Sequence, residues 1–274
     1  MNVREPVLYG SWYPKEPSKI DDFLSPFGKN AGVKSKAAVA PHAGWYYSGS
    51  IAAGSISCLE RGADTVVIIG GHLPAGMPFL FAGEDAVRSP YGLMRIDRDF
   101  SDRLAEKLNG KNDRYEDNTV EVLVPMAHSF FPEAKLLWVR FPNDLSSYMA
   151  GKKLYETAKN LNRKIAVIGS TDLTHYGGNY GFSPKGRGRK ALEWVKKTND
   201  HLFIKAVLEG RPEDVIRCAD ENRSACSAGA VLGVMGYTEQ AGGRAEMLEY
   251  GTSADRSGEH APESFVGYAS FVWK

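Results

Sequence analysis

The sequence has too few cysteines for a disulfide-bonded scaffold. Its three cysteines, Cys58, Cys218 and Cys226, are odd in number and have no CxxC spacing. This pattern argues against both a disulfide framework and a zinc ribbon. A reducing compartment fits the composition, so we expect a cytoplasmic protein.

Long apolar runs are also missing. The first residues, MNVREPVLYGSWYP, contain no apolar signal core. No uncharged apolar run approaches the roughly 20 residues that a membrane helix needs. We therefore expect neither secretion nor insertion into a membrane.

Charge of one sign is not in excess. Lys and Arg total 34 against 33 Asp and Glu, which gives a formal net charge of +1. This balance gives no electrostatic reason to expect nucleic acid or an anionic membrane as a partner. The phosphate-binding GxxxxGK[ST] and dinucleotide GxGxxG patterns are absent as well, which argues against nucleotide chemistry.

What the sequence does contain is a repeated design of a buried strand followed by a histidine. Three stretches, at residues 36–49, 64–72 and 164–177, each begin with an apolar run and lead into a turn, and these turns carry His42, His72 and His175. Strands of this kind alternate with helical patterns along the chain. We predict one α/β domain over residues 1–274, with a mostly parallel central sheet and helices on both faces.

His42 and His72 are the first candidates for a metal site. Ligands in open α/β sheets collect outside the carboxyl ends of the strands, so two imidazoles from neighbouring strands could meet there on one ion. Neutral imidazoles suit Fe(II), Zn and Cu and leave coordination positions open. The alternative is that both histidines are hydrogen-bonded structural residues.

Several motifs resemble those of one known family. They are GSWYP at 10–14, PHAGWYYSG at 41–49, IIGGH at 68–72, TVE at 119–121, STDLTHYG at 170–177, Cys226, YGTSAD at 250–255 and VGYA at 266–269. In order and spacing they resemble the Memo family, known in bacteria and archaea as AmmeMemoRadiSam system protein B. That family is similar in fold to the class III extradiol ring-cleaving dioxygenases. The resemblance implies a metal site held by His42 and His72.

The third ligand is less clear, because the ring-cleaving relatives use a carboxylate whereas the Memo-type site is associated with a cysteine near the C-terminal strands. Residues 250–256 contain no cysteine, and Asp255 is the nearest donor there. Asp255 would complete a two-histidine, one-carboxylate set. Glu121 is the second candidate. Cys226 is the third, provided that its helix begins at the pocket and lowers the pKa of its thiol.

His175 and Asp172 are the candidates for proton transfer. His175 lies where the ring-cleaving enzymes keep a histidine that handles protons, and an imidazole oriented by a carboxylate such as Asp172 can accept and return a proton. Alternatively, the two residues only hold their loop together. Near His42, the side chains of Trp45, Tyr46 and Tyr47 could form an aromatic wall for a flat ligand.

Three functions fit these residues. The first is an oxidoreductase of the dioxygenase type, with one transition-metal ion, most readily Fe(II) and alternatively Zn or Cu, acting on an unidentified small molecule. The second is a module that binds a peptide or protein in the same cleft, and the third is a metal-dependent hydrolase. A homo-oligomer is compatible with each. Fold similarity does not transfer a reaction, so catechol cleavage is not predicted.

Overall fold

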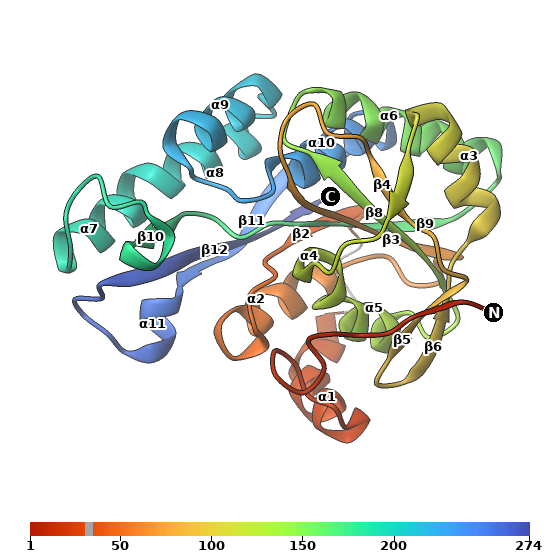
Figure 1. Cartoon of the computed structure of the whole chain (residues 1–274), viewed down its shortest axis with the longest axis horizontal. Helices are drawn as coiled ribbons and strands as arrows, with labels where there is room; N and C mark the ends of the chain where they lie inside the picture. The colour runs from red at the N-terminus through yellow and green to blue at the C-terminus, as the bar shows by residue number, and fades with distance from the viewer. Residues whose placement is uncertain (31–34) are drawn as a thin grey trace.

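The structure is a computed structural model that describes residues 1–30 and 35–274. Within these residues, four parallel strands form the centre of the main sheet in the order β2, β9, β3, β8 (Figure 1). The predicted α/β class and its parallel core are confirmed. The central strands are β2 (Ala37–Ala40), β9 (Ile165–Ser170), β3 (Thr65–Leu73) and β8 (Lys135–Pro142).

The strand next to this core on each side, β12 or β4, runs antiparallel to it, which the hydrophobic pattern did not reveal. On one side β12 runs antiparallel to β2 and also pairs with β10 and β11; on the other side β4 is antiparallel to β8 and carries β7. A small separate sheet joins β1, β5 and β6. These strands are β1 (Val3–Arg4), β4 (Leu80–Ala82), β5 (Ala86–Ser89), β6 (Gly92–Arg95), β7 (Lys111–Asp113), β10 (His175–Gly177), β11 (Ala245–Thr252) and β12 (Ser264–Trp273).

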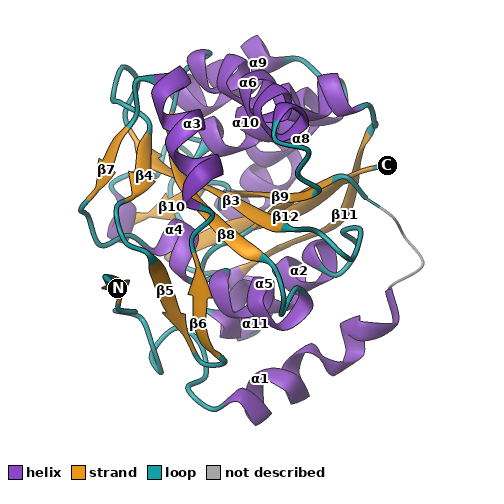
Figure 2. Ribbon diagram, turned by 90° about the vertical axis from the view of Figure 1, so that its right-hand side faces the viewer, coloured by secondary structure: helices purple, strands orange, loops and turns teal. Residues whose placement is uncertain are grey.

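Helices cover both faces of the main sheet, as predicted (Figures 1 and 2). Alternate residues of β3 serve the two layers, because successive side chains of a strand point to opposite faces. Val67 and Ile69 pack in one core, and Val66 and Ile68 pack in the other. On the first face lie α3 (Arg98–Leu108), α6 (Ser146–Asn160), α8 (Asp200–Leu208), α9 (Pro212–Asn222) and α10 (Ala228–Ala241). On the second lie α1 (Pro17–Leu24), α2 (Trp45–Ile56) and α5 (Val124–Phe130).

The close packing of α6 on α10 depends on glycine. A Cβ atom added to Gly151 would lie 2.0 Å from the carbonyl oxygen of Gly233, so the two helix backbones touch at this point. The remaining short helices are the 3₁₀ turns η1 (Ser25–Asn30) and η2 (Gly178–Tyr180), then α4 (Asn118–Glu121), α7 (Arg189–Trp194), the π-helical turn η3 (Val195–Asn199) and α11 (Ser253–Ser257).

The register of the parallel core brings the histidine loops to one edge. Ala40 of β2 pairs with Ser170 of β9, so His42 and Asp172 each lie two residues beyond a matched pair. Ile69 of β3 pairs with Gly169 of β9, and β3 continues to Leu73. The carboxyl ends of β2, β3 and β9 therefore present their loops at one place. No helix in the described part of the chain is long and apolar enough to cross a membrane.

Candidate metal centre

Three side chains with metal-ligating atoms converge at this edge. The ring centroids of His42 and His72 are 5.0 Å apart, with the rings nearly perpendicular at 88°. Cys226 Sγ lies 3.3 Å from His42 Nε2. One possible ligand atom from each of His42, His72 and Cys226 falls within 4.8 Å of the others. Within residues 1–30 and 35–274, no other group of three or more His, Cys, Asp or Glu side chains meets this criterion.

His42 is fixed by contacts to its backbone and to its ring. Its side chain is buried, its backbone N–H donates to Asp172 Oδ1 at 2.8 Å, and its Nδ1 lies 2.8 Å from Ser170 Oγ. Burial lowers the pKa of His42, so the neutral imidazole is favoured. With Nδ1 occupied by Ser170, Nε2 remains as the donor atom on the side of Cys226.

His72 is more exposed, at 33% for its side chain, and its Nδ1 lies 3.1 Å from Asp117 Oδ2. Burial alone would lower the pKa of His72, but hydrogen bonds with Asp117 and Cys226 raise it to about 10. The same contact, together with Arg140, lowers the pKa of Asp117 to about 2 despite its burial. Because Asp117 occupies Nδ1, Nε2 of His72 is left for a metal ion.

Cys226 lies directly before Ser227, the N-cap of α10. The condition set for it from the sequence, a helix that begins at the pocket, is therefore met. Burial would raise the pKa of the thiol, but the adjoining imidazoles of His42 and His72 lower it to about 5. A thiolate is the form that binds metal.

Asp255 does not join this cluster, contrary to the ranking made from the sequence. One carboxylate oxygen accepts hydrogen bonds from the backbone N–H and hydroxyl of Thr252, at 2.9 and 2.8 Å, and the other pairs with Lys196. Thr252 and Asp255 form a capping box at the start of α11. The role of Asp255 in the structure is thus to begin a helix, and Cys226, ranked last, provides the donor atom beside the histidines.

Glu121 is likewise committed elsewhere. Its carboxylate accepts hydrogen bonds from the backbone N–H groups of Val7 (3.0 Å) and Leu8 (2.7 Å) and from the hydroxyl of Tyr13 (2.9 Å). It therefore anchors the N-terminal segment that carries these three residues.

A cavity of about 690 Å³ opens beside His42 and His72. Tyr46 and Tyr47 line it, as the aromatic-wall hypothesis expected, but Trp45 does not. Trp45 is buried at 4% exposure, and its Nε1–H donates to the carbonyl of Val122 at 3.0 Å. The indole at the cavity belongs to Trp12 of the N-terminal segment.

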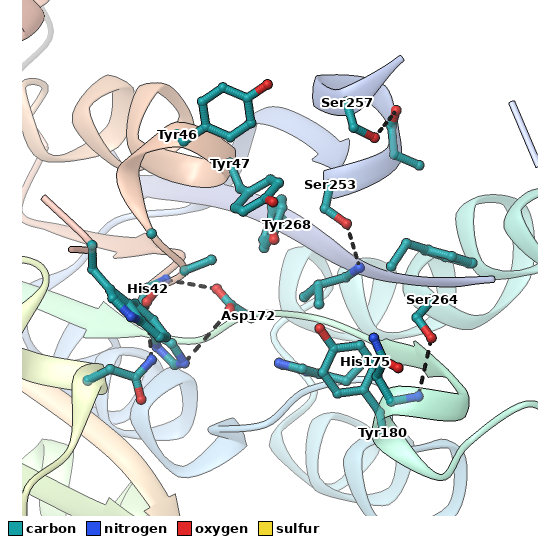
Figure 3. A pocket seen from close by; sticks show the side chains of 18 of the residues that line it. His42, Tyr46, Tyr47, Asp172, His175, Tyr180, Ser253, Ser257, Ser264 and Tyr268 are labelled. Atoms are coloured by element: carbon teal, nitrogen blue, oxygen red, sulfur yellow. Dashed lines mark hydrogen bonds and ion pairs between the residues drawn. The ribbon is translucent and has the colours of Figure 1, made fainter. Parts of the chain in front are cut away.

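Asp172 and His175 both line the cavity but are not hydrogen-bonded to each other in the described structure (Figure 3). The Asp172 carboxylate binds the backbone of His42, and burial raises its pKa. The Nδ1–H of His175 instead donates to the Leu173 carbonyl at 3.1 Å, and its ring meets the edge of Tyr180 at 5.0 Å between centroids. Orientation of His175 by Asp172 is therefore corrected to orientation by a backbone carbonyl.

Three residues of the site were missed by the sequence analysis. Asp117 and Ser170 hold the two histidine rings, and Trp12 lines the cavity. Signals were available: Asp117 precedes the TVE motif at a helix N-cap, Ser170 begins the STDLTHYG motif and Trp12 lies within GSWYP.

The donor set fits a transition-metal ion. Two imidazoles with their Nδ1 atoms engaged and a thiol with a lowered pKa are ligands typical of iron, copper and zinc. The orienting partners Ser170 and Asp117 match the arrangement usual around metal-bound histidines.

The fold and this site define an α/β protein with a two-histidine, one-cysteine cluster at the ends of parallel strands. The sequence profile of the family described as Memo-like protein matches residues 4–272. The chain belongs to this family, as the motifs indicated.

Curated relatives match along almost the whole chain. A MEMO1 family protein of Thermococcus kodakarensis is 30% identical and one of Pyrococcus furiosus is 29% identical, each with 99% of both chains covered. Among solved structures, an uncharacterized protein from Escherichia coli K12 shares 12% identity with a TM-score of 0.47, covering 76% of this chain and 85% of that one.

Proposed function

We propose that this chain is a metal-dependent oxidoreductase that holds one transition-metal ion through His42, His72 and Cys226 and acts on a small molecule. The observation that carries the proposal is the convergence of two imidazoles and a thiol within 4.8 Å beside a cavity of about 690 Å³. A cavity of this size suits a small organic ligand.

The ion expected first is Fe(II), because the resemblance to ring-cleaving dioxygenases favours it. Replacing the expected carboxylate with a thiolate makes the donor set softer, which makes copper and zinc stronger competitors than they would be at a carboxylate site. When bound, such an ion supplies a positive centre that polarises a ligand, and iron or copper also supplies one-electron redox chemistry.

The protein's own residues would prepare the ligand in the cavity. Part of the cavity wall is aromatic and suits a flat ring, although polar side chains line the rest. The aromatic residues are Trp12, Tyr46, Tyr47, Tyr180, Phe265 and Tyr268. His175 has its Nδ1–H committed to Leu173, so Nε2 is its free nitrogen. In the neutral ring this nitrogen can accept a proton from a bound hydroxyl and return it later.

Metal analysis of anaerobically purified protein tests the proposal. Wild-type protein should contain close to one iron or copper ion per chain, and His42→Ala, His72→Ala and Cys226→Ala should each lose it. Asp255→Ala is the matched control, since it removes a carboxylate engaged by Lys196 and Thr252 and should keep the metal.

Three outcomes would contradict the proposal. Metal that is retained in all three ligand variants would refute the site. Tightly held zinc with water-dependent bond cleavage would favour the hydrolase, and a metal-free cleft that binds peptide would favour the binding module.

A further inference from the structure

We propose that Asp117, backed by Arg140, is a positioning residue that fixes the ring of His72 for metal binding. This inference rests on the proposed metal centre. Asp117 is the N-cap of α4, and Arg140 projects from β8, so the support comes from two elements other than the strand that carries His72. Neither residue is one of the three proposed ligands.

His72 needs support because its backbone is unusual. Its φ angle of 56° lies in the left-handed region of backbone conformation, which residues other than glycine rarely adopt. Three hydrogen bonds to the backbone of Gly71 and His72 stabilise this conformation. The N–H of Gly71 donates to Thr119 Oγ1 at 3.0 Å, the N–H of His72 donates to Ser227 Oγ at 3.3 Å, and Arg140 Nε donates to the Gly71 carbonyl at 2.9 Å.

The support also joins His72 to the cysteine ligand. Ser227 directly follows Cys226, and a Cβ atom added to Gly71 would lie 2.3 Å from Ser227 Cβ. Strand β3 and the loop before α10 are therefore in contact at the glycine next to His72. Because of this contact, the positions of the second and third proposed ligands are set together.

The ring of His72 is oriented by a carboxylate that is itself fixed on both oxygens. Asp117 Oδ2 lies 3.1 Å from His72 Nδ1 and 3.3 Å from Arg140 Nη2. Its other oxygen, Oδ1, accepts the backbone N–H of Thr119 at 2.8 Å. The side chains of Asp117 and Arg140 are only 7% and 4% exposed. Such a carboxylate selects the tautomer with the proton on Nδ1, which leaves Nε2 for the ion.

The guanidinium behind Asp117 is itself held in place. Arg140 also pairs with Asp113, whose side chain is fully buried, at 3.3 Å. Its Nε donates to the Gly71 carbonyl at 2.9 Å, so Arg140 is fixed from two further directions. Asp117 therefore has a rigid partner on the side away from His72.

The experiment compares Asp117→Asn with Asp113→Asn in the full-length chain, using Co(II) as the probe. Both substitutions remove one carboxylate from Arg140, but only Asp117 contacts His72. Chelator competition should show Asp117→Asn weakening Co(II) affinity by about 10- to 100-fold, as is typical for residues that orient a metal-bound histidine. The thiolate-to-Co(II) absorption band should shift, whereas Asp113→Asn should leave the affinity and the band close to wild type.

His42→Ala separates this inference from the proposed function. If His42→Ala still binds Co(II) as tightly as wild type, the metal centre itself is wrong. If His42→Ala loses Co(II) while Asp117→Asn binds it as tightly as wild type, or no more weakly than Asp113→Asn does, the positioning role is overturned and the metal centre stands.

A measurement on the wild-type protein covers the case in which Asp117→Asn does not fold. Nitrogen NMR of ¹⁵N-histidine-labelled, zinc-loaded protein should show His72 with a protonated Nδ1 and a metal-bound Nε2. Binding of zinc through Nδ1 would overturn the proposal.

Discussion

The two ends of the cavity are built differently. At the end with the proposed metal site, called the metal end below, the His42 and His72 rings each bind a polar side chain from a different segment, Ser170 and Asp117 respectively. At the far end, the ring of His175 is held by the carbonyl of Leu173 in its own loop and by the edge of Tyr180, which is 38% exposed. Ligands oriented by neighbouring side chains suit a fixed ion, and a lightly held histidine suits a group that must adjust to a substrate.

The loop that carries His175 is nevertheless anchored, one residue earlier. The backbone N–H of Thr174 donates to Asp200 Oδ1 at 3.1 Å, and the Thr174 hydroxyl binds the same oxygen. Asp200 begins α8 directly after the π-helical turn η3, a feature often found near functional sites. The far end thus combines a fixed backbone with a freer ring.

The largest effect should come from a substitution at His175, which tests whether the two ends of the cavity have separate roles. His175→Ala should leave metal content close to wild type, because His175 is not part of the ligand cluster. It should reduce turnover of any substrate by about 10²- to 10⁴-fold, the usual contribution of a positioned acid or base. Metal analysis and steady-state rates on the same preparation measure both quantities. Loss of metal as severe as in His42→Ala would instead make His175 a ligand.

Much of this architecture was predictable from local sequence. The three apolar runs are central parallel strands, and their histidine-bearing loops meet at one edge because the strand register aligns Ala40 with Ser170. Hydrophobic pattern and the carboxyl-end rule were sufficient for this part. The antiparallel pairing of β12 and β4 with this core was not predictable, because the hydrophobic pattern of a strand does not specify the direction of its partner.

The third member of the proposed ligand set could not be predicted for a different reason. Asp255 and Cys226 are both distant from His42 in sequence, and choosing between them required knowing which loop reaches the ends of β2 and β3. That choice depends on long-range packing, such as the contact of Gly71 with Ser227. The capping box of Asp255 with Thr252 was the local signal against its use as a ligand.

A pH-dependent effect should appear at the far end. Asp200 is fully buried, and burial raises its pKa to about 6 although Thr174 and the Tyr250 hydroxyl, at 2.8 Å, oppose the shift. The folded chain therefore holds this proton more tightly than the unfolded chain. Its contribution to stability is complete below about pH 4 and is lost as pH rises through about 6, by at most about 3 kcal/mol.

Asp200→Asn should remove this dependence. Urea unfolding of wild type and variant at pH 4.5 and pH 7.5 gives the comparison, and the difference between the two proteins cancels the titration of other groups. The variant should gain stability relative to wild type at the higher pH, and its metal content should not change. An identical pH slope in both proteins would show that Asp200 titrates normally.

The smallest effect should come from Asp255→Ala. The substitution removes the side chain that accepts two hydrogen bonds from Thr252 and pairs with the half-buried Lys196, so helix α11 loses its capping box. Loss of such a cap costs about 1 kcal/mol of unfolding free energy. Because neither of these contacts involves His42, His72 or Cys226, chelator competition should give wild-type metal affinity.

Asp255→Asn is the informative partner: its amide oxygen can still accept from Thr252, so it should recover part of the stability while still leaving metal binding unchanged. A tenfold or greater loss of metal affinity in either variant, about 1.4 kcal/mol, would return Asp255 to the ligand set and would mean that α11 rearranges toward the metal end when the ion binds.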